Sequence, residues 1–217
     1  MRDTLKLVLH LLSTVAVLPA LVSYQVRRPW LGDDRAIEGS TQALALLPGL
    51  VGVYLRRAFL SRTLAHCDRS ASVHFGTILS QAGARLGANV YVGPGCHLGL
   101  VDLESDVLLA SGVHVPSGGR THGTDRLDVP IREQSGARTT VRIGEGSWVG
   151  SAAIVMADVG RHCVIGAGAV VTKPVPDYSV AVGVPARVVA VRQPSAADAA
   201  ASGSQARHEA SPPERLS

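Results

Sequence analysis

The sequence predicts an all-β solenoid made of hexapeptide repeats, and three observations support this fold class. Between residues 141 and 189 an aliphatic residue returns every six positions, usually with glycine next and a small residue four places on. The chain has 23 glycines but only 4% aromatic residues, a balance that suits a solenoid better than a sandwich. A short, constant period is typical of a β-helix, in which three hexapeptides form one triangular coil and the aliphatic side chains fill its interior.

The repeat assigns interior and corner positions in both halves of the chain. The expected interior residues are Leu86, Val92, Leu98, Leu103, Leu109, Val115, Ile143, Val149, Val155, Val159, Ile165 and Val171. The expected corner residues are Val90, Cys96, Val107, Val113, Ser147, Ala153, Cys163 and Ala169. Residues 67–85 should form one degenerate coil before the regular phase begins. Its candidates for the interior are Val73, Phe75, Ile78 and Leu79.

The period stops after Val115 and resumes near Val141, so residues 116–140 should leave the prism as an extended loop. A loop of this length in a compact repeat is usually functional. It contains a single histidine, His122. An imidazole exchanges protons near neutral pH and could take one from a hydroxyl, which makes His122 a candidate general base. The alternative is a solvated surface histidine.

Two other histidines, His97 and His114, occupy equivalent outward positions in successive coils. They should therefore stack about one strand spacing apart, near ~4.8 Å. Two stacked imidazoles suggest either a metal site or an outward-facing ladder at a subunit interface. The ladder is favoured because Ile154 comes next in this column and no third ligand falls there.

The amino-terminal residues 1–62 are expected to form apolar, membrane-associating helices. Leu5–Val26 is nearly continuous hydrocarbon with a central proline, and its length approaches the ~20 residues that span a bilayer. Ala43–Leu55 is a second, shorter apolar run, and both runs end in paired arginines. Basic flanks favour the cytoplasm, so the segments could span, re-enter or lie on the membrane. A cleaved signal peptide and helices buried in an oligomer are the alternatives.

Composition limits the remaining possibilities. A formal charge of +4 is mild and makes nucleic acid a poor candidate partner. The three cysteines show no CxxC spacing and are interpreted as small buried residues in a reducing compartment. The β-helix domain should cover residues 63–192, and residues 193–217, rich in Ala, Ser and Pro, are expected to be a disordered tail.

Three segments carry a resemblance to a known family: THGTDRLDVPI in the loop, IGEGSWVGSAAIVM, and IGAGAVVTKPVPDYSVAVGVPARVV. Over residues 73–189 the chain resembles the hexapeptide-repeat acyltransferases, in the branch that includes galactoside, serine, xenobiotic and exopolysaccharide O-acetyltransferases. This resemblance implies a left-handed parallel β-helix with a protruding catalytic loop. It also implies acetyl-coenzyme A as co-substrate, bound between neighbouring subunits of a homotrimer, with no metal.

The resemblance assigns roles to individual residues. His122 matches the general base, and Arg120 and Asp125 are candidates for binding the substrate. Arg120 stands where several relatives have a second histidine, which leaves His114 as the alternative base. Lys173 and Arg187 offer permanent positive charge for the phosphates of the cofactor. The full set of candidate cofactor-binding residues is Ser151, Ala167, Thr172, Lys173 and Arg187, and Trp148 could cover the cofactor or pack at the trimer contact.

The expected function is an acetyl-CoA-dependent O-acetyltransferase that transfers an acetyl group directly to a saccharide hydroxyl. The acceptor would belong to surface polysaccharide or lipid-linked glycan biosynthesis, at the cytoplasmic face of the bacterial inner membrane. Three alternatives remain at this point. The acceptor could be small, such as serine, an amino sugar or an antibiotic. The chain could also be a metal protein like the γ-type carbonic anhydrases, or a non-catalytic scaffold.

Overall fold

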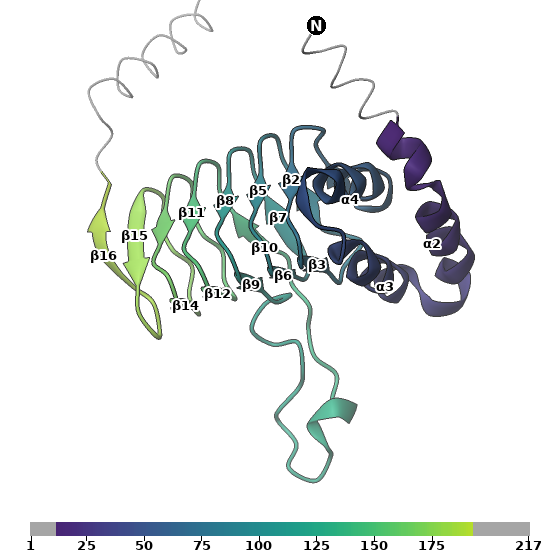
Figure 1. Cartoon of the computed structure of the whole chain (residues 1–217). Coiled ribbons are helices and arrows are strands. Elements are labelled where there is room, and N and C mark those ends of the chain that lie inside the picture. The colour runs from purple at the N-terminus through teal and green to yellow at the C-terminus, as the bar shows by residue number, and fades with distance from the viewer. Residues whose placement is uncertain (1–11, 193–217) are drawn as a thin grey trace, which may run out of the picture.

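The computed structural model describes residues 12–192, and its main body is a parallel β-solenoid with helices at its amino-terminal end (Figure 1). The helices are α2 (Leu18–Leu31), α3 (Asp33–Ala45) and α4 (Gly49–Thr63). The four-stranded sheet contains β1 (His66–Cys67), β4 (Arg85–Leu86), β7 (Val101–Leu103) and β10 (Val141–Ile143). The expected tail, residues 193–217, and the first residues of the Leu5–Val26 run lie outside the described residues.

Two further sheets complete the triangular prism. The seven-stranded sheet contains β2 (Ser72–Val73), β5 (Tyr91–Val92), β8 (Leu108–Leu109), β11 (Trp148–Val149), β13 (Val164–Ile165), β15 (Ser179–Val182) and β16 (Arg187–Val191). The five-stranded sheet contains β3 (Ile78–Leu79), β6 (His97–Leu98), β9 (His114–Val115), β12 (Ile154–Val155) and β14 (Val170–Val171). All ladders between coils are parallel, but β16 pairs with β15 antiparallel and so ends the parallel stacking.

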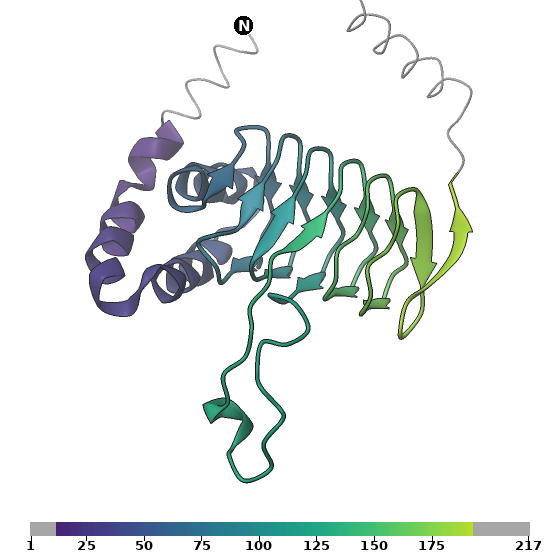
Figure 2. The same cartoon turned by 180° about the vertical axis from the view of Figure 1, so that it is seen from behind.

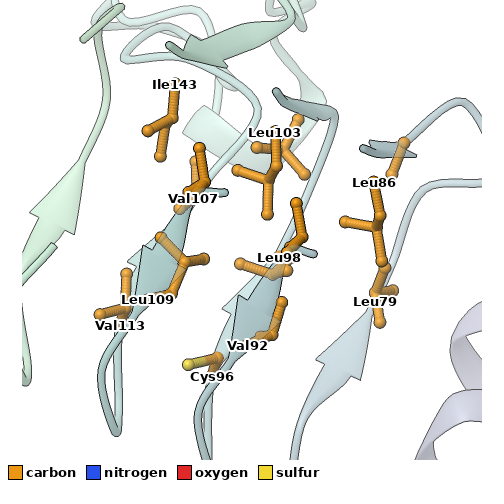
Figure 3. Packing of buried hydrophobic residues seen from close by; sticks show 14 of the residues in the cluster. Leu79, Leu86, Val92, Cys96, Leu98, Leu103, Val107, Leu109, Val113 and Ile143 are labelled. Carbon is orange, nitrogen blue, oxygen red and sulfur yellow. The ribbon is translucent and has the colours of Figure 1, made fainter. Parts of the chain in front are cut away.

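The predicted interior is confirmed at every regular position, since each of these aliphatic residues is buried in one continuous core. Figure 3 shows several of these side chains, among them Leu86, Leu98 and Leu109, stacked inside the prism. Two expectations for the degenerate first coil were wrong. Phe75 is 48% exposed at a corner, and Ile78 points outward while its neighbour Leu79 points in. In a two-residue strand successive side chains face opposite sides, so only one of the pair can be interior.

The corner position can hold a hydroxyl because the adjacent coil satisfies it. The Ser147 hydroxyl donates to the carbonyl of Gly160 (2.8 Å) and accepts from the amide of Cys163 (2.9 Å). Thr77 does the same in the first coil, donating to Gly93 and accepting from Cys96. The hydrogen bonds to both partners offset the cost of removing the hydroxyl from water, so these corners stay closed without an apolar side chain.

The three outer faces of the prism differ in chemistry. The outward column of the four-stranded sheet is polar: His66, Arg85, Asp102 and Arg142. The column of the seven-stranded sheet is mostly apolar: Ser72, Tyr91, Leu108, Trp148, Val164 and Val180. The column of the five-stranded sheet is Ile78, His97, His114, Ile154 and Val170. Only the first of these faces has the composition of a freely solvated surface.

The helices cover the amino-terminal end of the solenoid (Figures 1 and 2). α3 packs on β3, α4 packs on β1 and β2, and α2 lies outside α3. The run Ala43–Leu55 is not one segment, because α3 ends at Ala45 and α4 begins at Gly49. Within residues 12–192 none of the helices is both long and apolar enough to cross a bilayer.

One buried cation joins the helices to the solenoid. The Arg56 side chain on α4 is only 2% exposed. Its guanidinium donates to the carbonyl oxygens of Val73 (2.8 Å), Leu44 (2.9 Å) and Leu47 (2.8 Å). Burial lowers the pKa of this guanidinium below its usual value. The three bonds fix the end of α3, the α3–α4 turn and the first coil relative to one another.

Candidate functional site

The loop of residues 116–140 projects away from the prism as two facing, irregular segments (Figure 2). It leaves at the end of β9 and returns at β10, the boundaries that the break in the repeat predicts. Two backbone hydrogen bonds join its segments. The Thr139 amide donates to the Ser117 carbonyl (3.0 Å), and the Ala137 amide donates to the Arg120 carbonyl (2.7 Å). Hydrogen bonds therefore hold the two segments together at the base of the loop, where it leaves the prism.

The outer part of the loop is closed by one side chain. The Gln134 amide nitrogen donates to the carbonyls of Arg126 (2.7 Å) and Val129 (2.8 Å), and its oxygen accepts from the Arg126 amide (3.1 Å). A short 3₁₀ turn, η1 (Ile131–Glu133), lies just before it. The hydrogen bonds of the Gln134 side chain thus satisfy backbone groups that a strand ladder would otherwise satisfy in this outer part of the loop.

His122 lies between the base and the outer part, where the two segments of the loop come close together. A Cβ at Gly136 would come within 2.5 Å of the His122 amide nitrogen, and a Cβ at Gly123 within 2.6 Å of the Ser135 carbonyl. Only glycine fits this approach, so the backbone of His122 is held in place. Its imidazole is exposed and makes no hydrogen bond to the described residues.

A pocket of about 490 Å³ lies at the root of the loop, over the five-stranded sheet. His97, His114 and Ile154 line it from the sheet, and their order confirms the column that the repeat predicts. The two imidazole rings lie 5.9 Å apart, centroid to centroid, and are inclined by 43°. The other lining residues are Glu38, Ser80, Gln81, Gly99, Val115, Pro116, Ser117, Thr121 and Arg138.

The other candidate residues of the loop are not part of this pocket. Thr121 lines the pocket, whereas Arg120, His122 and Asp125 are exposed outside it. Asp125 makes no hydrogen bond to His122 in the described structure, so nothing there orients the imidazole. The neighbouring Arg126 instead binds Asp128 and lowers the pKa of that carboxyl.

The five candidate cofactor residues border the carboxy-terminal half of the five-stranded sheet. Ser151 and Ala167 occupy the same corner in adjacent coils, and the Gly168 amide donates to the Ser151 carbonyl (2.8 Å). Thr172 and Lys173 follow β14 at the other end of this sheet. Arg187 begins β16, next to a turn that bonds to β14. All five residues are exposed.

Sequence reasoning missed four of the residues around the pocket: Glu38, Ser80, Gln81 and Arg138. Glu38 lies on α3, which packs beside β3, and Arg138 lies on the returning segment of the loop. No motif marks these residues. Their only signal is tertiary packing, which places a helix and a loop against the same sheet.

Comparisons with known proteins agree with this architecture. No protein-family model matches the chain. A probable acetyltransferase of Mycobacterium tuberculosis is 34% identical over 139 residues, which are 60% of this chain and 46% of that protein. The serine acetyltransferase of Haemophilus influenzae is 35% identical over 89 residues, 40% of this chain and 28% of that protein. The chain thus spans less than half the length of these two curated relatives.

Solved structures share the fold. A maltose O-acetyltransferase from Clostridium difficile superposes with a TM-score of 0.55 at 20% identity, covering 74% of this chain and 87% of that one. AntD, an N-acyltransferase from Bacillus cereus, superposes with a TM-score of 0.52 at 13% identity, covering 70% and 96%. The fold and the outward columns define a hexapeptide-repeat β-solenoid protein. Together with the acetyltransferase relatives, they fit the hexapeptide-repeat acyltransferase family.

Proposed function

We propose that the chain is an acetyl-CoA-dependent O-acetyltransferase that acts on a saccharide hydroxyl. The observation that supports this proposal is that a pocket and two exposed cations lie beside the same sheet. The pocket beneath the loop and the exposed residues Lys173 and Arg187 both border the five-stranded sheet, where Ile154 of the pocket pairs with Val170 of β14. The maltose O-acetyltransferase and AntD, which was crystallised with coenzyme A and an amino-sugar nucleotide, support a saccharide acceptor.

In this mechanism residues of the chain bind and position the two substrates and deprotonate the acceptor hydroxyl. Lys173 and Arg187 hold the phosphates of the acetyl donor, which supplies a thioester. His122 removes the proton from the acceptor hydroxyl. The oxygen then bonds to the acetyl carbonyl carbon as the carbon–sulfur bond breaks, and the proton on His122 passes to the leaving thiolate. Direct transfer of this kind requires the two substrates to be held side by side, which a continuous sheet face permits.

The test is to mix the purified chain with acetyl-CoA and saccharides and to follow thiol release and product mass. Maltose and glucosamine serve as hydroxyl and amino acceptors. We expect an acetyl ester, which mild alkali removes, whereas an amide survives that treatment. An amide as the main product would contradict O-acetylation, and no transfer to any saccharide or cell-envelope glycolipid would contradict the saccharide acceptor.

A homotrimer is part of the same proposal. The apolar column of the seven-stranded sheet leaves Tyr91, Leu108 and Trp148 partly exposed, and apolar strips of this kind usually mark contacts. His122 is uncovered within one chain, so a neighbouring copy could supply the opposite wall of its site. We expect Leu108→Glu to convert trimers to monomers in analytical ultracentrifugation. His66→Glu, on the polar column, should leave the mass unchanged, and a wild-type monomer would contradict the trimer.

Binding to the cytoplasmic face of the bacterial inner membrane is also proposed, through one surface of the amino-terminal helices. Exposed apolar side chains recur every three or four residues along it: Leu12, Val15, Leu18, Val22, Val26 and Trp30. Trp30 is 87% exposed beside two arginines, as is typical of an interfacial anchor. A lipid-linked glycan precursor of a surface polysaccharide would then be the natural acceptor.

The membrane proposal predicts a clear change in vesicle binding. The double variant Val22→Asp, Val26→Asp should lower co-sedimentation with phosphatidylcholine–phosphatidylglycerol vesicles about tenfold or more, because carboxylates would enter the apolar stripe. Val191→Asp, an exposed valine on β16, is the matched control and should bind normally. Equal binding of both variants, or no binding of the unaltered chain, would reject this surface.

A further inference from the structure

A second cavity, of about 440 Å³, continues the pocket along α3. The two cavities share Glu38, Ser80, Gln81 and Arg138, so they form one groove. We name this the α3 groove. It runs from His97 and His114 to the α2–α3 turn at Gly32. Each cavity alone lies within the roughly 300–1,000 Å³ that is usual for a small-ligand site.

The shared middle of the α3 groove has polar groups without partners. Among the described residues, neither the Glu38 carboxylate nor the Arg138 guanidinium makes a hydrogen bond or an ion pair. The acidic residues further along are engaged, because Asp33 binds Arg28 (2.7 Å) and Asp34 accepts from the Ala82 amide (3.1 Å). Two uncommitted charges that line one cavity are positioned to bind a ligand.

Gln81 adds a third group of the same kind. Its residue is only 9% exposed, and its amide nitrogen donates to the Ser80 carbonyl (2.9 Å). No donor within residues 12–192 binds its side-chain oxygen, which keeps access to solvent on a residue that lines the groove. An acceptor that is open to solvent and free of protein partners can bind a hydroxyl of a ligand.

The chemistry of these groups favours an uncharged, hydroxyl-rich ligand. A carboxylate accepts and a guanidinium donates, so Glu38 and Arg138 can each bind a pair of sugar hydroxyls. The unpaired Glu38 carboxylate repels an anionic group placed beside it, and the unpaired Arg138 guanidinium repels an ammonium. The imidazoles and Ile154 at the other end present flat and apolar surface to the carbon–hydrogen face of a ring.

We propose that the α3 groove binds a second, uncharged sugar unit of the acceptor, next to the unit that is acetylated. This inference rests on the proposed function. It makes α3 a specificity element of the site, because Glu38 reaches the pocket from the helical layer. The chain should therefore prefer neutral disaccharides or longer glycans to their monosaccharides.

The experiment compares maltose, cellobiose and lactose with glucose and galactose in two assays. Saturation-transfer NMR measures binding without acetyl-CoA, and thiol release measures turnover. We expect at least one disaccharide to bind tenfold or more tightly than its monosaccharides. Glu38→Gln and Arg138→Gln, where the two cavities join, should raise the KM for that disaccharide about tenfold, and by a larger factor than the KM for the monosaccharide, with kcat changed less than twofold.

Glu145→Gln, an exposed position outside the groove, is the control and should change neither value. Equal binding of every disaccharide and its monosaccharides would overturn the inference, as would equal losses for both in the two groove variants. If disaccharides bind and the groove variants abolish binding while no acetyl group is ever transferred, the groove stands and the proposed reaction fails.

Discussion

Replacement of His122 by alanine should lower kcat for acetyl transfer by about 10²–10⁴-fold, the usual contribution of a general base. The physical reason is that no other titratable side chain of the loop is held at the same place by the Gly123–Gly136 approach. The Kd for acetyl-CoA, measured by calorimetry, should stay within twofold, because the candidate phosphate ligands lie on other elements. Thiol release in the presence of the acceptor measures the loss.

Two control variants make this result specific. His66→Ala, on the polar face of the prism, should keep full activity. His114→Ala tests the alternative base, which lines the pocket at the root of the loop. Full turnover in His122→Ala together with a large loss in His114→Ala would move the base from the loop to the sheet.

Replacement of Arg56 by alanine should lower the free energy of unfolding by about 3 kcal/mol or more. The variant loses three hydrogen bonds from a charged donor, each worth roughly 1.5–3 kcal/mol, and leaves the Val73 carbonyl without this donor. The Leu44 carbonyl keeps the Leu47 amide as a donor (3.3 Å). The free energy of unfolding of Arg56→Lys should lie between those of the unaltered chain and Arg56→Ala. An ammonium keeps the charge but cannot reproduce the planar arrangement of N–H donors of the guanidinium. Urea unfolding followed by circular dichroism gives the values.

Arg69→Ala is the matched control, because Arg69 is exposed and makes no hydrogen bond or ion pair among the described residues. We expect its free energy of unfolding to change by less than about 0.5 kcal/mol. A loss in Arg56→Ala no larger than that would mean that water replaces the guanidinium, and that the helices are held to the solenoid by apolar packing alone.

The solenoid itself could be predicted because each interior position is a local consequence of the period. Leu98 and Ile143 are interior for the same reason, and a break in the period sufficed to place both ends of the loop. The pairing of His97 with His114 followed directly, since parallel coils of equal length bring equivalent residues together. Phe75 was misassigned because the first coil lacks neighbours on one side and its corner is set by the α3–α4 turn instead.

The pocket was harder to predict because its walls come from three elements that no repeat relates. Glu38 is an ordinary polar residue of a short helix until Thr41 of the same helix bonds to Leu79 and fixes α3 beside β3. Arg138 reaches the same cavity only because the loop returns alongside its own departure. Long-range packing of this kind produces no periodic pattern in the sequence. The repeat therefore predicted His97 and His114 in the column, but it could not predict Glu38 and Arg138 on the other walls of the groove.

The reversal of β16 has a consequence for how molecules of this protein meet one another. Strand edges at the ends of a rod are templates on which further chains can add. At one end α3 and α4 cover the first coil, and at the other the last strand runs against the direction of all those before it. A second molecule stacked in the same direction therefore cannot continue the parallel ladders at either end of the solenoid. Concentrated solutions should therefore hold discrete particles, and filaments built head to tail should not form.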